Sequence, residues 1–354
     1  MRLADLTTLR VGGEARELRQ PATRDELIDT ARGIWAQGDE WMALGGGSNV
    51  LVADAGFDGC VIHTVTRGII SLNEIAADAD QTTSLADGDN YVTLRVEAGE
   101  PWDDLVALTV ERGLTGIEAL SGIPGSTGAA PIQNIGAYGQ ELSDTLVAVD
   151  FLDYDSGDLV TLRADQLGLE YRTSAMKQGH RGLVISVDIR LTDARGLGAP
   201  VAFEQLAGAL GVPLGTRVPL ADIRQRVLEL RSSKGMVLDA SDPDSVSAGS
   251  FFTNPIVARS FAVDLPATAP RFETGAEGAR VKLAAAWLIE RAGIHRGFSL
   301  PGSCAAISSK HTLAIVNRGG ATAAQIAELA RFVQERVRNE FGVTLHPEPV
   351  YVGF

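Results

Sequence analysis

The sequence has little cysteine and no long apolar run. Only two cysteines, Cys60 and Cys304, occur in 354 residues, and their separation fits neither a disulfide framework nor a metal site. We expect a buried structural thiol at each position. No run of about 18 apolar residues is present, so no segment is predicted to span a membrane. The N-terminal residues lack the apolar core of a secretory signal, which predicts a cytoplasmic protein.

Basic residues are too few to balance the acidic ones. Lys and Arg total 31 against 45 Asp and Glu, giving a formal net charge of −14. This disfavours nucleic acids and anionic membranes as partners, because both need a basic surface. An anionic small molecule is still allowed, since a pocket can be locally basic. The length predicts two or three domains, and 45% hydrophobic with 21% charged residues is typical of a globular chain.

The segment Ser121–Gly139 has almost no charge and is rich in backbone-shaping residues. It contains five glycines and two prolines, which disfavours both a regular helix and a regular strand. Ser, Thr, Gln and Asn add polar groups to this stiff frame. Long ordered loops in compact domains are usually functional, so the segment predicts a loop wrapped around a polar ligand. The alternative is a well-packed internal turn without a ligand.

A second glycine-rich segment follows a predicted strand at 41–44. It reads G-G-G-S-N over 45–49 and leads into a further predicted strand at 50–52. Successive N–H groups of a glycine turn can hold an anion. The spacing does not fit the Rossmann fingerprint, because no helix follows. The alternative is a simple β-turn between two strands.

Three further residues are candidates for chemistry. Arg172 is a cation in an acidic neighbourhood, and its guanidinium suits a carboxylate or a phosphate. Ser250 lies in A-G-S-F-F-T-N-P, without the G-x-S-x-G pattern of a nucleophile elbow. Glu348 stands between two prolines, which indicates a positioned carboxylate. The alternatives are a surface charge, a turn serine and a loop-tip acid, respectively.

Apolar periodicity and punctuation residues predict the remaining elements. Helices are predicted at 24–37 with Thr23 as the cap, 101–112 with Pro101 at its first position, 221–231, 281–292 and 321–339. Strands are predicted at 41–44, 50–52, 60–65, 91–98, 146–153, 159–162, 183–191, 313–316, 343–345 and 350–352. A hairpin tip or an insertion is predicted at 73–90, where acidic and polar residues dominate.

Several strings, taken together and in order, resemble the UDP-N-acetylenolpyruvoylglucosamine reductase family. They are T-T-L-R-V-G-G-E-A (7–15), G-G-G-S-N-V-L-V (45–52), V-E-A-G-E-P-W (96–102), I-P-G-S-T-G-A-A-P-I-Q-N-I-G-A-Y-G-Q-E (123–141), Y-R-T-S (171–174), A-G-S-F-F-T-N-P (248–255), V-K-L-A-A-A-W-L-I-E (281–290) and P-E-P-V-Y-V-G (347–353). The resemblance covers nearly the whole chain. The continuous region 171–254 resembles the type I form of the family.

The resemblance implies an α+β fold with three parts. A two-lobed FAD-binding domain of the vanillyl-alcohol-oxidase (PCMH) type is expected, together with a separate α+β substrate-binding domain. The expected bounds are 1–72 plus 341–354 for the first lobe, 73–232 for the second lobe and 233–340 for the substrate-binding domain.

The resemblance also implies an activity. NADPH reduces non-covalently bound FAD, which then reduces UDP-N-acetylglucosamine enolpyruvate to UDP-N-acetylmuramate in peptidoglycan precursor synthesis. The expected catalytic residues are Ser250 as proton donor, with Arg172 and Glu348 stabilising the charge that develops on the substrate. No metal, nucleic acid or membrane partner is expected, and the protein is expected to be a monomer.

Binding residues are implied by the same resemblance. The expected FAD contacts are Gly45, Gly46, Gly47, Ser48, Asn49, Val50, Ser121, Pro124, Gly125, Ser126, Gly128, Ala129, Gln133, Asn134, Gly136, Ala137 and Tyr138. The expected substrate contacts are Tyr171, Phe203, Lys234 and Asn254. Phe203 departs from the family pattern, which often has a tyrosine there; the ring would keep its stacking surface and lose a hydroxyl bond.

Two other functions are compatible with parts of the sequence. One is an FAD-dependent oxidase or dehydrogenase of alcohols or sugars on the same scaffold, which would need neither Ser250 nor a UDP-sugar domain. The other is a non-catalytic nucleotide-binding module, which the density of motifs disfavours.

Overall fold

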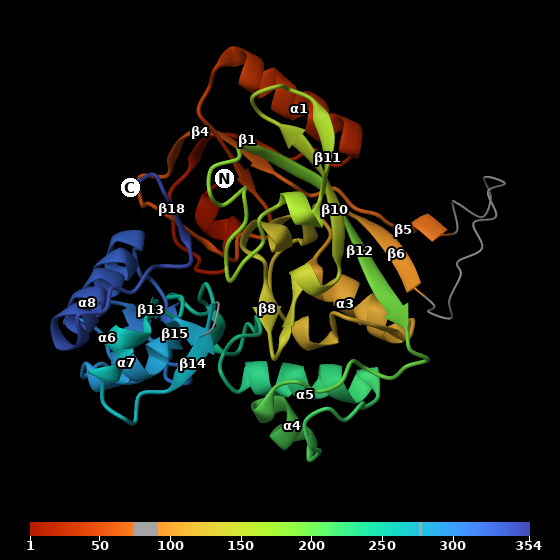
Figure 1. The fold of residues 1–354 in the computed structure, drawn as a ribbon. Coiled ribbons are helices and arrows are strands. Elements are labelled where there is room, and N and C mark those ends of the chain that lie inside the picture. Colours follow the sequence, from red (N-terminus) through yellow and green to blue (C-terminus); the bar gives the residue numbers. More distant parts are fainter. Residues whose placement is uncertain (74–90, 276–277) are drawn as a thin grey trace. The chain divides into compact units, whose positions relative to one another are not determined.

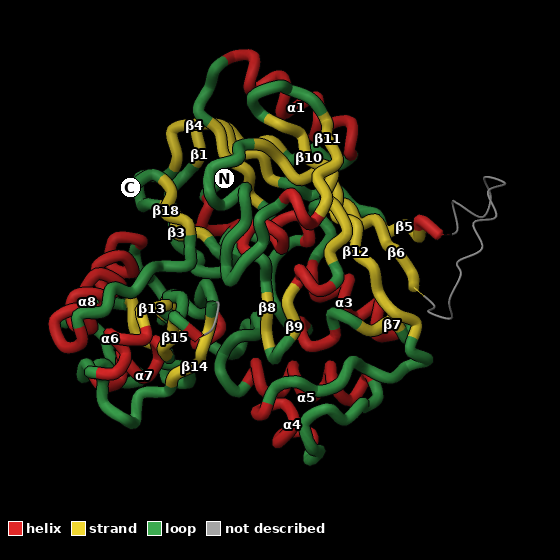
Figure 2. Tube along the Cα trace, in the orientation of Figure 1, coloured by secondary structure: helices red, strands yellow, loops and turns green. Residues whose placement is uncertain are grey.

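The computed structural model describes residues 1–73, 91–275 and 278–354. Within them the chain forms two compact units, each built from segments that are distant in sequence (Figures 1 and 2). Unit 1 consists of Met1–Ala15, Gly47–Phe57 and Ser233–Phe354, whereas unit 2 consists of Arg16–Gly46 and Asp58–Ser232. Both units mix helices and strands, so the predicted α+β class is confirmed.

One predicted domain boundary coincides with a boundary between the units. The predicted substrate-binding domain begins at residue 233, where unit 2 ends and unit 1 resumes. The other boundaries, which divide the preceding chain into two lobes and assign 341–354 to the first of them, are not tested by this division and stay predictions.

A six-stranded antiparallel sheet forms the centre of unit 2 (Figure 1). Its strands run in the order β11-β10-β12-β6-β5, and β7 pairs with the end of β12. The bounds are β5 (Ile69–Ser71), β6 (Tyr91–Glu97), β7 (Leu114–Thr115), β10 (Leu146–Asp153), β11 (Leu159–Arg163) and β12 (Gly182–Asp193). The four strands predicted here are confirmed to within two residues. The hairpin tip or insertion predicted at 73–90 lies outside the described residues except for Asn73.

One face of the sheet is largely apolar, because side chains alternate along a strand. Helix α3 (Trp102–Glu111) packs its Trp102, Leu105 and Val106 into the same buried cluster as this face. Each fully buried side chain of this size stabilises the fold by about 1.5–3 kcal/mol. The strand residues of the cluster are Leu94, Val96, Leu114, Leu146, Val149, Phe151, Val184, Val187, Ile189 and Leu191. The predicted helix is confirmed, but Pro101 is its N-cap rather than its first helical residue.

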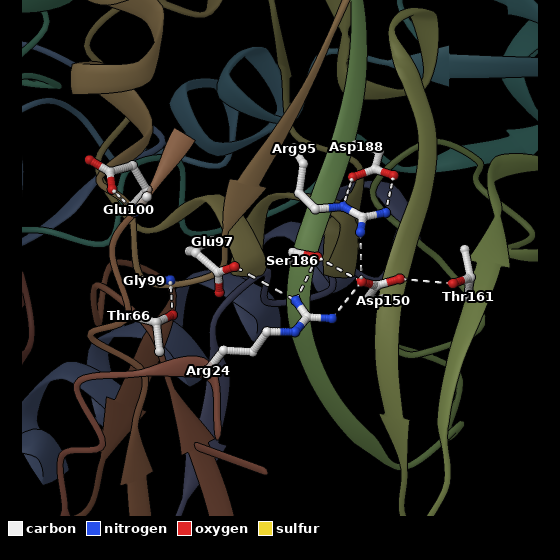
Figure 3. Close-up of polar contacts among 11 residues, drawn as sticks. Arg24, Thr66, Arg95, Glu97, Gly99, Glu100, Asp150, Thr161, Ser186 and Asp188 are labelled. Atoms are coloured by element: carbon white, nitrogen blue, oxygen red, sulfur yellow. Dashed lines mark hydrogen bonds and ion pairs between the residues drawn. The ribbon is translucent and has the colours of Figure 1, made fainter. Parts of the chain in front are cut away.

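A network of charged residues extends across β6, β10 and β12 (Figure 3). Arg95 forms a bidentate ion pair with Asp188, and each of its two hydrogen bonds is 2.8 Å long. Asp150 accepts a bond of 2.6 Å from Arg24 and one of 2.8 Å from Thr161. Because the carboxylates of Asp150 and Asp188 are nearly buried, these guanidinium and hydroxyl donors replace the water that each charge would otherwise need.

Helix α1 (Arg24–Gln37) supplies Arg24 to this network. Thr23 and Glu26 form the capping box at its start, as predicted from Thr23, and Gly38 ends it at φ +70°. Its apolar stripe packs both against the second sheet of unit 2, which has the order β1-β4-β2, and against Leu152, Leu183 and Ile185 of the six-stranded sheet. The strands of that sheet are β1 (Ala15–Arg19), β2 (Trp41–Leu44) and β4 (Phe57–His63). The strand predicted at 60–65 therefore begins and ends earlier than expected.

Short elements and two further helices complete unit 2. Helices α4 (Glu204–Leu210) and α5 (Leu220–Ser232) pack on each other around a small buried cluster. The strands β8 (Gly136–Ala137) and β9 (Gln140–Glu141) form a hairpin. The short 3-10 helices are η2 (Glu118–Leu120), η3 (Thr127–Gln133), η4 (Leu142–Asp144) and η5 (Ala164–Gln166).

Unit 1 surrounds helix α8 (Ala323–Phe341), whose apolar side packs into the largest core cluster of the unit. Its sheets have the orders β13-β15-β14, β16-β17 and β18-β3. The strands are β3 (Val50–Val52), β13 (Ile256–Ala258), β14 (Arg271–Thr274), β15 (Arg280–Leu283), β16 (Ala305–Ile307), β17 (Ile315–Asn317) and β18 (Val350–Val352). The remaining helices are η1 (Leu3–Leu6), η6 (Pro243–Ser245), α6 (Arg259–Val263) and α7 (Ala285–Arg291).

Three predictions for unit 1 are wrong. The helix predicted at 281–292 is a strand followed by a shorter helix, because β15 pairs on both sides and α7 starts only at Ala285. No strand forms at 343–345 among the described residues; Val343 and Leu345 are buried in the core instead. Cys304 is exposed, in the turn before β16, whereas Cys60 is buried as predicted.

Candidate functional site

The first two glycines of the 45–49 loop pack directly against the 121–139 loop in unit 2. A Cβ atom at Gly45 would collide with Ser126 Oγ, and one at Gly46 would lie 2.6 Å from Gly125 Cα. Because no residue with a side chain fits there, the two backbones can approach closely and present N–H groups to a ligand. The two loops expected to bind the cofactor are therefore side by side at this point.

The 121–139 loop is anchored on the V-E-A-G-E-P-W string before it. Gly128 N–H donates to Ala98 O at 2.8 Å, and Trp102 N–H donates to Gly125 O at 3.0 Å. Asp103 bonds both Gly122 N–H and Arg224, each at 2.6 Å. Burial opposes the charge of Asp103, but the bonds from Arg224 and Gly122 outweigh it and lower the pKa of the carboxyl. These hydrogen bonds hold the loop in one conformation.

Two residues expected to contact the cofactor direct their side chains into the protein. Ser121 is fully buried and donates its hydroxyl to Glu118 O at 2.7 Å. Asn134 adopts a left-handed backbone at φ +45°, and its amide bonds Glu141, Ser143 and the Glu170 carbonyl. These two side chains therefore shape the loop from within the protein.

Arg172 attaches to the same loop. Its guanidinium donates to Asn134 O at 2.9 Å and to Gly136 O at 2.5 Å, and it lies 5.4 Å from the ring centre of Tyr171. Arg172 has a left-handed backbone at φ +55°, which is uncommon for a residue with a side chain. Ser174, which received no role from the sequence, fixes the segment by donating to Ile132 O at 2.6 Å.

Ser250 and Glu348 belong to unit 1, and the structure joins their segments. Glu348 N–H donates to Phe251 O at 2.9 Å, and Phe251 N–H donates to Leu313 O at 2.7 Å. Phe251 and Phe252 are buried in the core with ring centres 5.4 Å apart. These aromatic anchors leave Ser250 partly exposed, and its hydroxyl forms no hydrogen bond with the described part of the chain.

The second half of the glycine loop contacts the Glu348 segment within unit 1. Asn49 Nδ2 donates to Glu348 O at 3.2 Å, and Val350 N–H donates to Asn49 O at 2.9 Å. Parallel pairing of β18 with β3 continues this contact through residue 352. A Cβ atom at Gly47 would collide with Leu6 O, so this glycine too is required by packing.

The residues expected to hold the substrate have different surroundings. Asn254 Oδ1 accepts the Ala285 N–H at 2.9 Å and so caps α7. Phe203 is 43% exposed, and its ring meets that of Tyr138 edge-on with 5.8 Å between centres. Lys234 is partly buried just after α5. The ring of Phe203 is thus accessible, and its contact with the substrate stays a prediction.

Sequence reasoning missed the buried arginine beside Tyr138. Arg231 is 7% exposed; burial lowers its pKa, against the opposing influence of Tyr138 and Asp103. Burial likewise raises the pKa of Tyr138, against the charge of Arg231. Arg231 follows Ile223 and Val227 at intervals of four residues, so helical periodicity alone places it on the buried side of α5.

A cavity of about 720 Å³ lies in unit 2, and Tyr138 is one of the residues that line it. Glu118, Arg190 and Arg217 line it, whereas Arg172 does not. Glu118 is 1% exposed and accepts bonds from Thr115 Oγ1, Gly116 N–H and Ala199 N–H. Its carboxylate therefore holds the walls of this cavity together.

The described residues lack two features. They contain no group of three or more His, Cys, Asp or Glu side chains that could hold a metal ion. No helix in the same ranges is long and apolar enough to cross a membrane.

Comparison with known proteins defines the class first. Residues 16–163 match a family model described as an FAD binding domain, and residues 242–352 match the UDP-N-acetylenolpyruvoylglucosamine reductase C-terminal domain. With the closely packed glycine loops, these matches define an FAD-dependent oxidoreductase with an FAD-binding domain of the vanillyl-alcohol-oxidase type, as expected.

Similar proteins then give the family. The UDP-N-acetylenolpyruvoylglucosamine reductase of Leifsonia xyli is 56% identical, over 99% of this chain and 98% of that protein. The one from Thermobifida fusca is 47% identical, over 99% and 96%. A crystal structure of the Thermus caldophilus enzyme matches with a TM-score of 0.63 at 28% identity, covering 99% of this chain and 97% of that one. The chain belongs to the UDP-N-acetylenolpyruvoylglucosamine reductase family.

Proposed function

We propose that the protein reduces UDP-N-acetylglucosamine enolpyruvate to UDP-N-acetylmuramate with NADPH and bound FAD, in peptidoglycan precursor synthesis. Family membership supports the substrate. The observation that carries the mechanism is the bond from Glu348 N–H to Phe251 O, which fixes the segment of Ser250 beside that of Glu348. An alcohol oxidase would not need the segments of Ser250 and Glu348 to lie together.

The loops of unit 2 suit FAD. Gly46 lets its backbone lie close to that of Gly125, and Gly45 lies against the Ser126 hydroxyl, so we expect backbone N–H groups to face the ligand here. Such groups bind a diphosphate well. When bound, FAD supplies the hydride chemistry, accepting a hydride from NADPH and giving it to the methylene carbon of the enolpyruvyl group. The contacts assigned to residues 45–50 and 121–138 remain part of this proposal.

Ser250 supplies the proton in this mechanism. Hydride addition to the methylene carbon turns the double bond into a single bond and leaves negative charge on the carbon beside the carboxylate. The Ser250 hydroxyl gives its proton to that carbon, and the resulting alkoxide is reprotonated from solvent. A hydroxyl is a weak acid, so its geometry must be favourable. The absence of a competing hydrogen bond at Ser250 within the described ranges leaves the proton available.

Arg172 and Glu348 would control the charge that develops. A guanidinium stabilises a carboxylate whose charge increases during the reaction. Arg172 now donates to two loop carbonyls, which hold its guanidinium in place. Glu348 must act as an acid or through water, because a bare carboxylate beside an enolate would be repulsive. Tyr171, Phe203, Lys234 and Asn254 are proposed to hold the UDP-sugar.

Stopped-flow measurement of flavin absorbance tests this proposal. In Ser250→Ala we expect reduction by NADPH at the native rate and reoxidation by the enolpyruvyl substrate to fall by at least about 100-fold. Ser260→Ala is the matched control, since Ser260 is an exposed serine on α6 of the same unit. Native reoxidation in Ser250→Ala would refute the role of Ser250. Reduction of the flavin by simple alcohols, or reoxidation of the native enzyme by oxygen but not by the enolpyruvyl substrate, would refute the substrate.

A further inference from the structure

The segment that carries Ser250 is fixed at its downstream end by the bonds of Phe251 to Leu313 and Glu348. Its upstream end needs a separate restraint, because Gly249 has a left-handed backbone at φ +68° and glycine turns are otherwise adaptable. The position of the Ser250 hydroxyl therefore depends on what holds residues 246–249.

Ser247 restrains this upstream end through two hydrogen bonds. Its hydroxyl accepts the Gly249 N–H at 3.2 Å, which sets the turn directly before Ser250. Its carbonyl accepts the hydroxyl of Thr8 at 2.6 Å, across 239 residues of sequence. Ser247 is 3% exposed and Thr8 is 6% exposed, so water does not compete for this bond.

Thr8 also holds the glycine loop. Its N–H donates to Gly47 O at 3.1 Å. The chain around Thr8 is itself restrained, because Asn317 Nδ2 donates to Leu9 O at 3.1 Å. All these residues belong to unit 1. One threonine thus bonds both the glycine loop, through its backbone, and the Ser250 segment, through its side chain.

We propose that Thr8 is a positioning residue that sets the Ser250 hydroxyl relative to the glycine loop. It touches neither the reacting atoms nor the cofactor, and it acts through Ser247 and Gly249. This inference rests on the proposed function, because it requires Ser250 to be the proton donor. A shift of about 1 Å at a reacting group can cost about 100-fold in rate. We expect Thr8→Val to slow reoxidation by about 10- to 100-fold.

The neighbouring residue provides a matched control. Thr7 is 8% exposed, and its hydroxyl has no hydrogen-bond partner among the described residues. Thr7→Val therefore makes the same isosteric exchange one position away without breaking a bond. Thr8→Ser is the rescue variant, since it keeps the hydroxyl that bonds Ser247.

The experiment compares the flavin-loaded variants Thr8→Val, Thr8→Ser, Thr7→Val and Ser250→Ala. Reduction by NADPH and reoxidation by the enolpyruvyl substrate are measured separately, the latter in light and heavy water. A slower protonation should raise the solvent isotope effect on reoxidation in Thr8→Val alone among the threonine variants. Hydrogen–deuterium exchange of a peptide spanning 246–252 gives a readout independent of activity, and its protection should fall in Thr8→Val only.

The outcomes separate this inference from the proposed function. Selective loss of reoxidation with faster exchange in Thr8→Val, restored in Thr8→Ser, supports the role of Thr8. Equal loss in both half-reactions, or native reoxidation in Thr8→Val, overturns it while a slow Ser250→Ala still upholds the proposed function. If Thr8→Val does not fold, Ser247→Ala breaks the next link, and the same criteria apply to it.

Discussion

Removing the carboxylate of Asp150 should lower the free energy of unfolding by about 2–3 kcal/mol. Asp150 is 6% exposed and accepts bonds from Arg24, Thr161 and Ser186 (Figure 3). It also lies 3.5 Å from Arg95. In Asp150→Ala these donors lose their shared acceptor in the middle of the sheet.

The magnitude follows from how far the arginines can regain water. Removing one partner of a fully buried ion pair costs about 3–5 kcal/mol, because the other charge stays buried. The side chains of Arg24 and Arg95 keep 29% and 30% exposure, and Arg95 retains Asp188. Partial hydration and the remaining pair reduce the cost to about 2–3 kcal/mol.

Urea unfolding followed by tryptophan fluorescence measures this change. Trp35, Trp41 and Trp102 lie in unit 2, so the signal mainly reports the unit that contains the network. The control is Asp165→Ala, which removes a pair with Arg163 at 2.8 Å in which the two side chains are 63% and 73% exposed, respectively. We expect the control to change stability by less than about 0.5 kcal/mol. Equal stabilities of the two variants would refute the reasoning from burial.

The same variant has a predicted pH dependence. Burial opposes the charge of Asp150, but the bonds from Thr161 and Arg24 and the charge of Arg95 outweigh it and lower the pKa of the carboxyl. A carboxyl with a lowered folded pKa stabilises the fold above its unfolded pKa of about 3.9 and loses that effect as the pH falls through the folded pKa. The difference between native protein and Asp150→Ala should therefore be full at neutral pH and shrink in acid.

Three further predictions concern other elements. Glu97→Gln should stabilise the protein at neutral pH, because burial raises the pKa of Glu97 although the charge of Arg24 lowers it. Urea unfolding at neutral and acidic pH should show that the gain in stability becomes smaller in acid. Gly46→Ala should lower FAD affinity by about 10-fold or more, since the new methyl group would push apart two backbones, and flavin retained on dialysis measures it; full retention would contradict the packing. Thr23→Ala should cost about 1 kcal/mol in unfolding free energy by removing the cap of α1, and urea unfolding of this variant beside the exposed control Ser260→Ala measures the loss.

The sequence predicted elements well where local chemistry and tertiary packing agree. Thr23 and Gly38 bound α1 because capping groups act within a few residues. The prediction of a helix failed at 281–283, where apolar residues at helical spacing form part of strand β15. That strand is fixed by β13 and β14, which come from residues whose pairing no local pattern records. Long-range pairing therefore overrides helical periodicity there.

The residues of the candidate site also fall into those that the sequence indicated and those that it did not. Its glycines were recognisable because close backbone approach demands glycine, and Arg172 became a candidate because a guanidinium suits a carboxylate. The inward side chain of Asn134 and the capping of α7 by Asn254 were not, since both depend on partners at other sequence positions. Thr8 was invisible for the same reason, because its hydrogen-bond acceptor lies 239 residues away.

The pairing of β18 with β3 has a consequence for synthesis of the chain. The Asn49 amide meets its acceptor at Glu348, 299 residues later, so the ribosome must complete almost the whole sequence before this contact can form. Unit 2 ends at Ser232 and can become compact earlier. The first two segments of unit 1 cannot pair with the third segment until residues 233–354 have been synthesised. Contacts between residues so far apart in the sequence form slowly, and unpaired strand edges are exposed until they form. Unit 1 is accordingly the part of a nascent chain that most needs protection from aggregation.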